Sequence, residues 1–171
     1  MTTGKLSEKM YNALNEQIRN EYFSAYLYLA MSACCQDMNL PGTANWFRAQ
    51  YKEELSHGDK IYDYMFARSA RVKLLQIDQP AFEWESPLSM FRNALEHEKY
   101  VTGLINNLVT IANEDKDYAT LSFLQWFVNE QVEEESAAEA IIAQFEMAGA
   151  SKGNLMYLDK CLGKRKAENG D

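Results

Sequence analysis

Carboxylates interrupt the apolar stripes of this sequence at helical spacing. Glu21 lies seven residues after Leu14 and seven before Tyr28, so it falls on the apolar face of its segment. Glu54 has the same place in the next apolar segment, and His57 follows it by three residues, which puts both side chains on one face of a helix. A carboxylate that faces a core must be paired, protonated or bound to a cation.

Two later segments repeat the pattern. Glu98 lies on the apolar stripe of the third segment, and Gln131 and Glu134 lie on that of the fourth. Glu21 and Glu54 lie at about equal distances in sequence from the break DMNLPG. Glu98 on one side, and Gln131 and Glu134 on the other, lie at about equal distances from the polar turn NEDKD. If these breaks join antiparallel helices, the polar groups of each hairpin meet at one level.

Four carboxylates at one level place four negative charges in a low-dielectric core, and no basic residue on these stripes opposes them. Two divalent cations would balance this charge. A set of carboxylates with one imidazole and no thiolate suits Fe(II) or Mn(II) better than structural zinc. Di-iron bundles use two ExxH pairs; this chain has one, from Glu54 to His57, and a QxxE from Gln131 to Glu134.

Helices are needed to position these groups. Apolar periodicity predicts helices over about 5–36, 43–69, 87–113 and 117–148, and a short one over 154–163. Thr43 is the expected N-cap of the second helix, and Pro87 the first residue of the third. The extended linker over about 72–86 is long enough to span a bundle, so the second and third helices are expected to be parallel. Residues 1–171 are therefore predicted to form one all-α domain, a four-helix bundle with one long crossover and a short fifth helix.

Composition narrows the classes of partner. The chain has 171 residues and a formal net charge of −8 at pH 7, which does not suit nucleic acid or an anionic membrane. It has no apolar stretch of about 18 residues that would span a bilayer, and its N-terminal segment lacks an apolar signal core. Cys34, Cys35 and Cys161 lack the CxxC spacing of zinc and redox sites, and a reduced, cytoplasmic location is expected.

Over essentially its whole length the chain resembles the non-haem ferritins of bacteria and archaea. The resemblance rests on LNEQIRNEYFSAYLYLAMS around Glu21, EELSH at 53–57, EHE at 96–98, FLQWFVNEQVEEE at 123–135, the linker length and GNLMYLDK from Gly153. It implies the ferritin-like fold and a hollow homo-oligomeric cage of twenty-four subunits. It also implies ferroxidase activity, in which O2 or H2O2 oxidises Fe(II) in each bundle, and storage of the product as ferric mineral.

The same resemblance implies roles for individual residues. Glu21, Glu54 and His57 correspond to the family's first iron site. Glu54 would bridge to a second iron held by Glu98 and Glu134.

Further residues correspond to the surroundings of these two irons. Gln131 would be a hydrogen-bonding neighbour. Glu53, Glu130 and Glu133, with Glu134 shared, resemble a third iron site of the prokaryotic type, although they also fit a solvated acidic face.

Two aromatic residues and one leucine complete the comparison with the family. Tyr28 and Trp126 match aromatic residues beside the family's site and would supply an electron during oxygen reduction, although they are also ordinary core residues. Bacterioferritins have a second ExxH in place of QxxE and a haem-ligating Met in place of Leu55, so no haem is expected.

Three other classes compete with this interpretation. A rubrerythrin-like di-iron peroxidase uses a similar bundle without mineral storage, but usually carries a CxxC module that is absent here. A DNA-protecting mini-ferritin places its iron ligands between subunits and lacks the fifth helix. A purely structural bundle of the cytokine kind has no reason to place four glutamates in its core.

Overall fold

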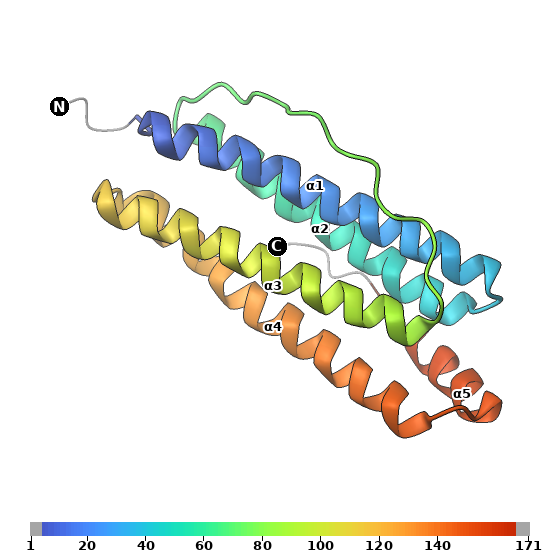
Figure 1. Ribbon diagram of the computed structural model, residues 1–171. Helices are drawn as coiled ribbons and strands as arrows, with labels where there is room; N and C mark the ends of the chain where they lie inside the picture. The colour runs from blue at the N-terminus through green and yellow to red at the C-terminus, as the bar shows by residue number, and fades with distance from the viewer. Residues whose placement is uncertain (1–4, 167–171) are drawn as a thin grey trace.

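The computed structural model describes residues 5–166, which form five α-helices and no strand. They are α1 (Glu8–Asp37), α2 (Pro41–Ala67), α3 (Pro87–Glu114), α4 (Tyr118–Ala148) and α5 (Lys152–Leu162). Figure 1 shows the four long helices side by side in a bundle, with α5 at one end. The linker between α2 and α3 runs along the bundle, so these two helices point in the same direction (Figure 1). The predicted all-α bundle with one long crossover and a short fifth helix is confirmed.

Most helices begin at a cap that the local sequence provides. The side chains of Ser7, Ser86, Asp117 and Ser151 each accept a hydrogen bond from the backbone N–H three residues further on. Pro87 occupies the first turn of α3, as predicted, where its missing N–H costs no hydrogen bond. These caps satisfy N–H groups that have no partner within their own helices.

The start of α2 is different, and the prediction that Thr43 caps it is wrong. The helix begins at Pro41, and Leu40 at the N-cap position provides no side-chain hydrogen bond. Thr43 is buried in the first turn, where its N and Oγ1 donate to Asp159 Oδ1 at 2.7 and 2.8 Å. Gly42 N donates to Asp159 Oδ2 at 3.0 Å. A carboxylate from α5 therefore caps α2 and compensates the positive end of its dipole.

Gly42 permits this close approach. A Cβ atom at this position would lie 1.8 Å from the backbone oxygen of Asp159, so α5 cannot dock here against any other residue type without a shift of the backbone. The end of the bundle is thus closed by α5 through one buried carboxylate and one glycine.

The apolar core consists of two clusters with a buried polar layer between them. The cluster nearer α5 includes Tyr28, Phe47 and Phe91, and the other includes Leu14 and Ile61. Along each of the four long helices, the segment between the two clusters carries buried polar side chains: Glu21, Ser24, Gln50, Glu53, Glu54, His57, Glu98 and Gln131. Apolar packing on both sides therefore restricts the access of water to this layer.

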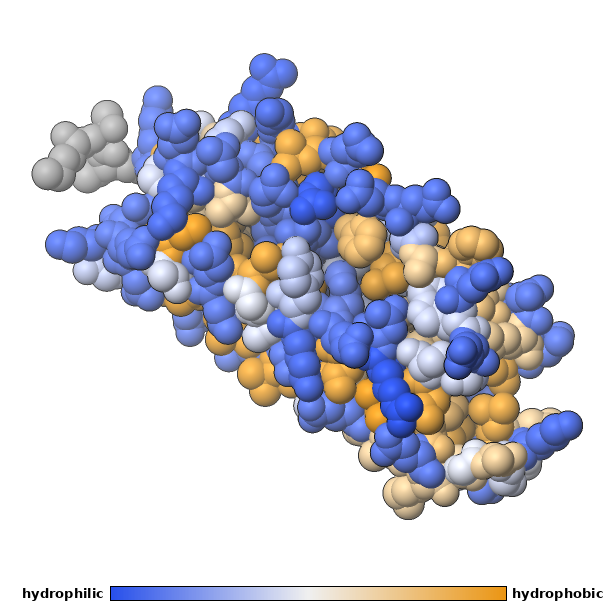
Figure 2. All heavy atoms as spheres, viewed as in Figure 1, coloured by the Kyte–Doolittle hydropathy of each residue, from blue (hydrophilic) through white to orange (hydrophobic). Residues whose placement is uncertain are grey.

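The surface of the described residues includes exposed apolar side chains. Figure 2 shows them scattered among hydrophilic residues on one face. Phe82 of the linker is 67% exposed and lines a groove with Tyr26 of α1 and with Met38, which follows α1. Within residues 5–166, no helix is both long enough and apolar enough to span a membrane.

Candidate metal centre

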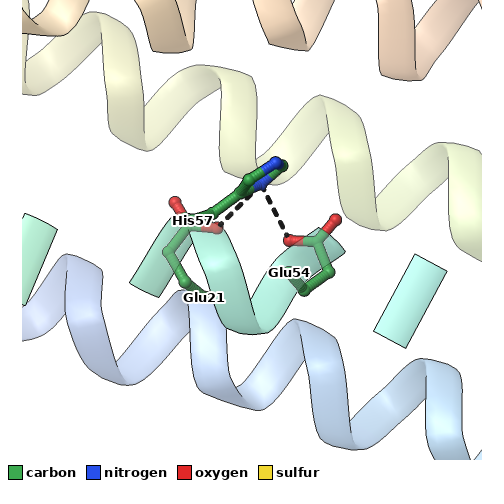
Figure 3. A group of neighbouring side chains, drawn as sticks. All are labelled: Glu21, Glu54 and His57. Carbon is green, nitrogen blue, oxygen red and sulfur yellow. Dashed lines mark ion pairs between the residues drawn. The ribbon is translucent and has the colours of Figure 1, made fainter. Parts of the chain in front are cut away.

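One group of possible metal ligands joins α1 to α2. Glu21 of α1 lies beside Glu54 and His57 of α2 (Figure 3). His57 Nδ1 lies 3.4 Å from Glu54 Oε2 and 4.0 Å from Glu21 Oε2. One ligand atom from each residue lies within 4.8 Å of the other two, and all three side chains are buried. The short connection between the helices and the equal distances of the two glutamates from it place them at one level.

A second group includes residues from the other two long helices. Glu54 of α2, Glu98 of α3 and Glu134 of α4 also offer ligand atoms within 4.8 Å of one another. Glu54 belongs to this group as well as to the first. Two sets of ligands that share one carboxylate can hold two neighbouring cations with that carboxylate between them.

Two glutamines, which the sequence argument missed, hold these carboxylates in place. Gln17 Nε2 donates to Glu21 Oε1 at 2.7 Å. Gln50 Nε2 donates to Glu54 Oε1 at 3.0 Å and to Glu134 Oε2 at 2.7 Å. Each glutamine precedes a candidate ligand by four residues, a spacing that places both on one helix face and that is visible in the sequence. Such hydrogen bonds orient ligands before a metal arrives.

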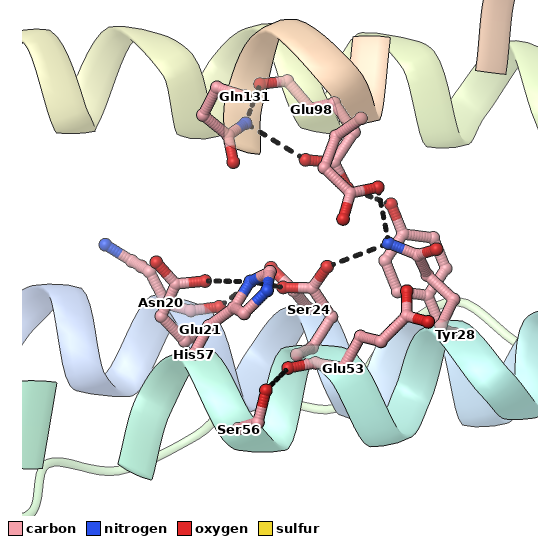
Figure 4. Close-up of polar contacts among 12 residues, drawn as sticks. Asn20, Glu21, Ser24, Tyr28, Glu53, Ser56, His57, Glu98 and Gln131 are labelled. Carbon is pink, nitrogen blue, oxygen red and sulfur yellow. Dashed lines mark hydrogen bonds and ion pairs between the residues drawn. The ribbon is translucent and has the colours of Figure 1, made fainter. Parts of the chain in front are cut away.

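Gln131 and Tyr28 both contact Glu98 (Figure 4). Gln131 Nε2 donates to Glu98 Oε2 at 3.1 Å and to its backbone oxygen at 3.2 Å. The Tyr28 hydroxyl donates to Glu98 Oε1. Glu98 is thus fixed by an amide from α4 and a phenol from α1, and the Tyr28 ring lies next to a candidate ligand.

The electrostatics of the layer favour the uptake of cations. Burial, reinforced by the charge of Glu54, raises the pKa of Glu21 and of Glu98 to about 8, and burial raises the pKa of Glu134 well above its usual range. Burial acts to lower the pKa of His57, but the charge and hydrogen bond of Glu54 raise it to about 10. His57 in turn lowers the pKa of Glu54 against the opposing effect of burial. Without cations, the cluster therefore limits its negative charge by retaining protons, which a metal would displace.

A third group lies beside the first two. His57, Glu130 and Glu134 offer ligand atoms within 4.8 Å of one another. Of the residues predicted for a third iron, Glu130 and Glu134 belong to this group, whereas Glu53 and Glu133 do not. Glu53 makes an ion pair with an arginine that follows α5, and Glu133 is exposed.

Trp126 of α4 lies against the imidazole. The ring centres of Trp126 and His57 are 5.2 Å apart with nearly perpendicular planes, and Lys60 Nζ lies 4.2 Å from the Trp126 ring centre. Trp126 therefore contacts a candidate ligand on the side of the layer away from Tyr28, and the lysine places a positive charge over the indole.

The fold and this layer together define a class of protein, a single-crossover helical bundle with a carboxylate-rich centre. A family model described as a ferritin-like domain matches residues 11–148. The chain belongs to the ferritin family.

Particular relatives make the comparison more specific. Bacterial non-heme ferritins from Staphylococcus aureus (strain USA300) and Staphylococcus haemolyticus (strain JCSC1435) are 43% and 44% identical over 160 residues, covering 94% of this chain and 96% of each relative. A solved open pore ferritin from the hyperthermophilic archaeon Archaeoglobus fulgidus is 46% identical, with a TM-score of 0.94 over 95% of this chain and 100% of that chain. A humanized archaeal ferritin is 45% identical, with a TM-score of 0.95 over 96% and 100%. The predicted resemblance to non-haem ferritins of bacteria and archaea is confirmed.

Proposed function

We propose that this chain is an iron-storage protein with ferroxidase activity, and that Fe(II) is oxidised within the polar layer of each bundle. Its membership of the ferritin family supports storage and oxidation of iron. The observation that carries the assignment of the centre is that Glu54 belongs to two groups of ligand atoms, which suits a pair of adjacent irons.

In this proposal the two irons are oxidised together. Glu21, Glu54 and His57 hold one Fe(II), and Glu54, Glu98 and Glu134 hold the other. Each Fe(II) gives up one electron, so a pair reduces O2 to H2O2, or H2O2 to two water molecules, with uptake of two protons in either case. The protein holds the metals next to each other between two apolar clusters, while the redox chemistry belongs to iron.

Residues around the pair have supporting roles in the proposal. Gln131 orients Glu98. Tyr28 and Trp126 contact candidate ligands, and each would supply one electron where O2 is reduced with four electrons and four protons to two water molecules, the two irons supplying the other two electrons. A third iron is bound beside the pair by Glu130 and Glu134, and Glu53 and Glu133 complete its ligands.

The proposed function requires many copies of the chain to assemble around a cavity. We propose a homo-oligomeric cage of twenty-four subunits in the cytoplasm, with ferric mineral inside and without haem. The relatives are ferritins, and the exposed apolar residues of the linker and of α5, such as Phe82 and Met156, suit burial between copies of the chain.

Aerobic addition of Fe(II) to the metal-free protein tests storage. We expect fast oxidation of about two or three Fe(II) per chain, the number that the candidate positions can hold, followed by retention of far more iron in solution. The iron is expected to co-elute with a large assembly on size-exclusion chromatography, whereas a sample without protein precipitates. Uptake that stops at the site stoichiometry would leave the di-iron centre in place, contradict storage and favour a rubrerythrin-like peroxidase.

A further inference from the structure

The chain that follows α5 returns to α2 beside the polar layer. Asn45 Nδ2 donates to the backbone oxygens of Gly163 and Arg165 at 3.2 and 2.9 Å. The same end of α2 is held by Asp159 of α5. A Cβ on Gly163 would lie 3.1 Å from the Cα of Gly42, so the two backbones pass very close to each other. Residues 163–165 are therefore fixed against the first turn of α2.

This anchoring delivers a guanidinium group to Glu53. Arg165 Nη2 makes an ion pair with Glu53 Oε2, and the side chains of the two residues are only 23% and 11% exposed. The Arg165 Cζ atom lies 4.2 Å from the centre of the Trp46 ring, which places the cation over an aromatic face. Arg165 Nη1 is buried and has no hydrogen-bond partner among residues 5–166. The guanidinium is thus held by one aromatic face and one carboxylate, with part of its hydrogen-bonding capacity unused.

Glu53 lies one helical turn from a member of the third group of ligand atoms. It precedes His57 by four residues on α2, so the two side chains lie on the same helix face. His57 forms the third group together with Glu130 and Glu134. A guanidinium and a divalent cation compete for a carboxylate, because each is stabilised by the same negative charge.

We propose that Arg165 is a positioning residue that sets the affinity of the third cation position. In the absence of a cation it holds Glu53, and a cation that takes Glu53 as a ligand must displace the guanidinium. Trp46 and the hydrogen bonds from Asn45 keep the segment on α2 when the ion pair breaks. The third position therefore binds a cation more weakly than it would without the ion pair. This inference rests on the proposed function, of which it defines one site.

Anaerobic Zn(II) titration by calorimetry, at pH 7 in one buffer, tests the proposal without any redox step. In the Arg165→Gln variant we expect the third Zn(II) per chain to bind about tenfold more tightly, since a competing charge has been removed, and the first two to bind as in the wild type. Lys164→Gln is the matched control, because it removes the same charge from an adjacent, exposed residue and is expected to change nothing. Arg165→Lys keeps the charge without the planar group, so its affinity for the third Zn(II) is expected to lie between those of the wild type and Arg165→Gln. This variant provides the test if Arg165→Gln fails to fold.

A double-mutant comparison identifies the carboxylate concerned. Glu53→Gln is expected to weaken the third Zn(II), and adding Arg165→Gln to it is expected to have no further effect on that affinity. If the affinity for the third Zn(II) is unchanged or lower in Arg165→Gln, or if it rises equally in Lys164→Gln, the role of Arg165 is overturned. The proposed di-iron centre would not be affected by that result. If the wild-type protein fails to bind two Zn(II) per chain, the proposed di-iron centre is overturned, and the role of Arg165 with it.

Discussion

Replacement of Glu54 by alanine is expected to slow the initial oxidation of Fe(II) by at least about 100-fold, or about 2.7 kcal/mol in the barrier. Glu54 contributes a ligand atom to both the first and the second group, so its loss removes one ligand from each proposed iron. It also removes the carboxylate that lies 3.4 Å from His57 Nδ1. Stopped-flow absorbance after aerobic mixing, at about two Fe(II) per chain, measures the rate.

Glu139→Ala provides the matched control for this experiment. Glu139 is an exposed residue of α4, 3.8 Å from Lys99 in a surface ion pair, and its replacement is expected to leave the oxidation rate within about twofold of the wild type. Circular dichroism and size-exclusion chromatography verify that both variants are folded and assembled. If Glu54→Ala oxidises Fe(II) at the wild-type initial rate, Glu54 is not a ligand of the irons, and the two irons do not share its carboxylate.

Binding of metal to the centre is expected to release protons. The pKa values of Glu21 and Glu98 are raised to about 8 and that of His57 to about 10, so these groups are largely protonated at pH 7 without metal. A metal binds only their deprotonated forms, so its affinity is expected to rise with pH up to these pKa values and to fall as pH drops. These three groups release about three protons, so the overall affinity for the metal pair changes about 1000-fold per pH unit below their pKa values.

Calorimetry with Zn(II) in two buffers of different ionisation enthalpy counts these protons. Glu98→Gln removes one titrating ligand and is expected to lower the number released by about one, while Glu139→Ala keeps the wild-type number. Proton release near zero at pH 7, together with an affinity that does not depend on pH between 6 and 8, would contradict the proposed binding at these residues.

Much of the architecture follows from the periodicity of the sequence. Heptad spacing of Glu21 and Glu54 within apolar stripes, and their equal distance from the first interhelical turn, predict that they meet in the core, and they lie there in one group of ligand atoms. The long linker, which contains Pro80 and ends just before Pro87, predicts the crossover that makes α2 and α3 parallel. These inferences succeed because the helix period determines faces and levels, which depend little on details of side-chain conformation.

Other features depend on contacts that periodicity does not encode. Asp159 caps α2 from 116 residues away, which is why the local signal at Thr43 was misleading. Arg165 and Glu53 are 112 residues apart, and nothing in either segment indicates that they pair. Gln50 is different, because its spacing of four residues from Glu54 is visible in the sequence. An uncharged amide on an apolar face does not by itself require a cation, so this spacing alone does not indicate a metal centre.

Anomalous X-ray diffraction at the iron edge directly tests whether two cations share Glu54 inside one bundle. Crystals exposed to Fe(II) without oxygen are expected to show one iron among Glu21, Glu54 and His57 and another among Glu54, Glu98 and Glu134, with the Glu54 carboxylate touching both. A single iron in the bundle, or irons that do not contact Glu54, would show that Glu54 does not bridge two cations.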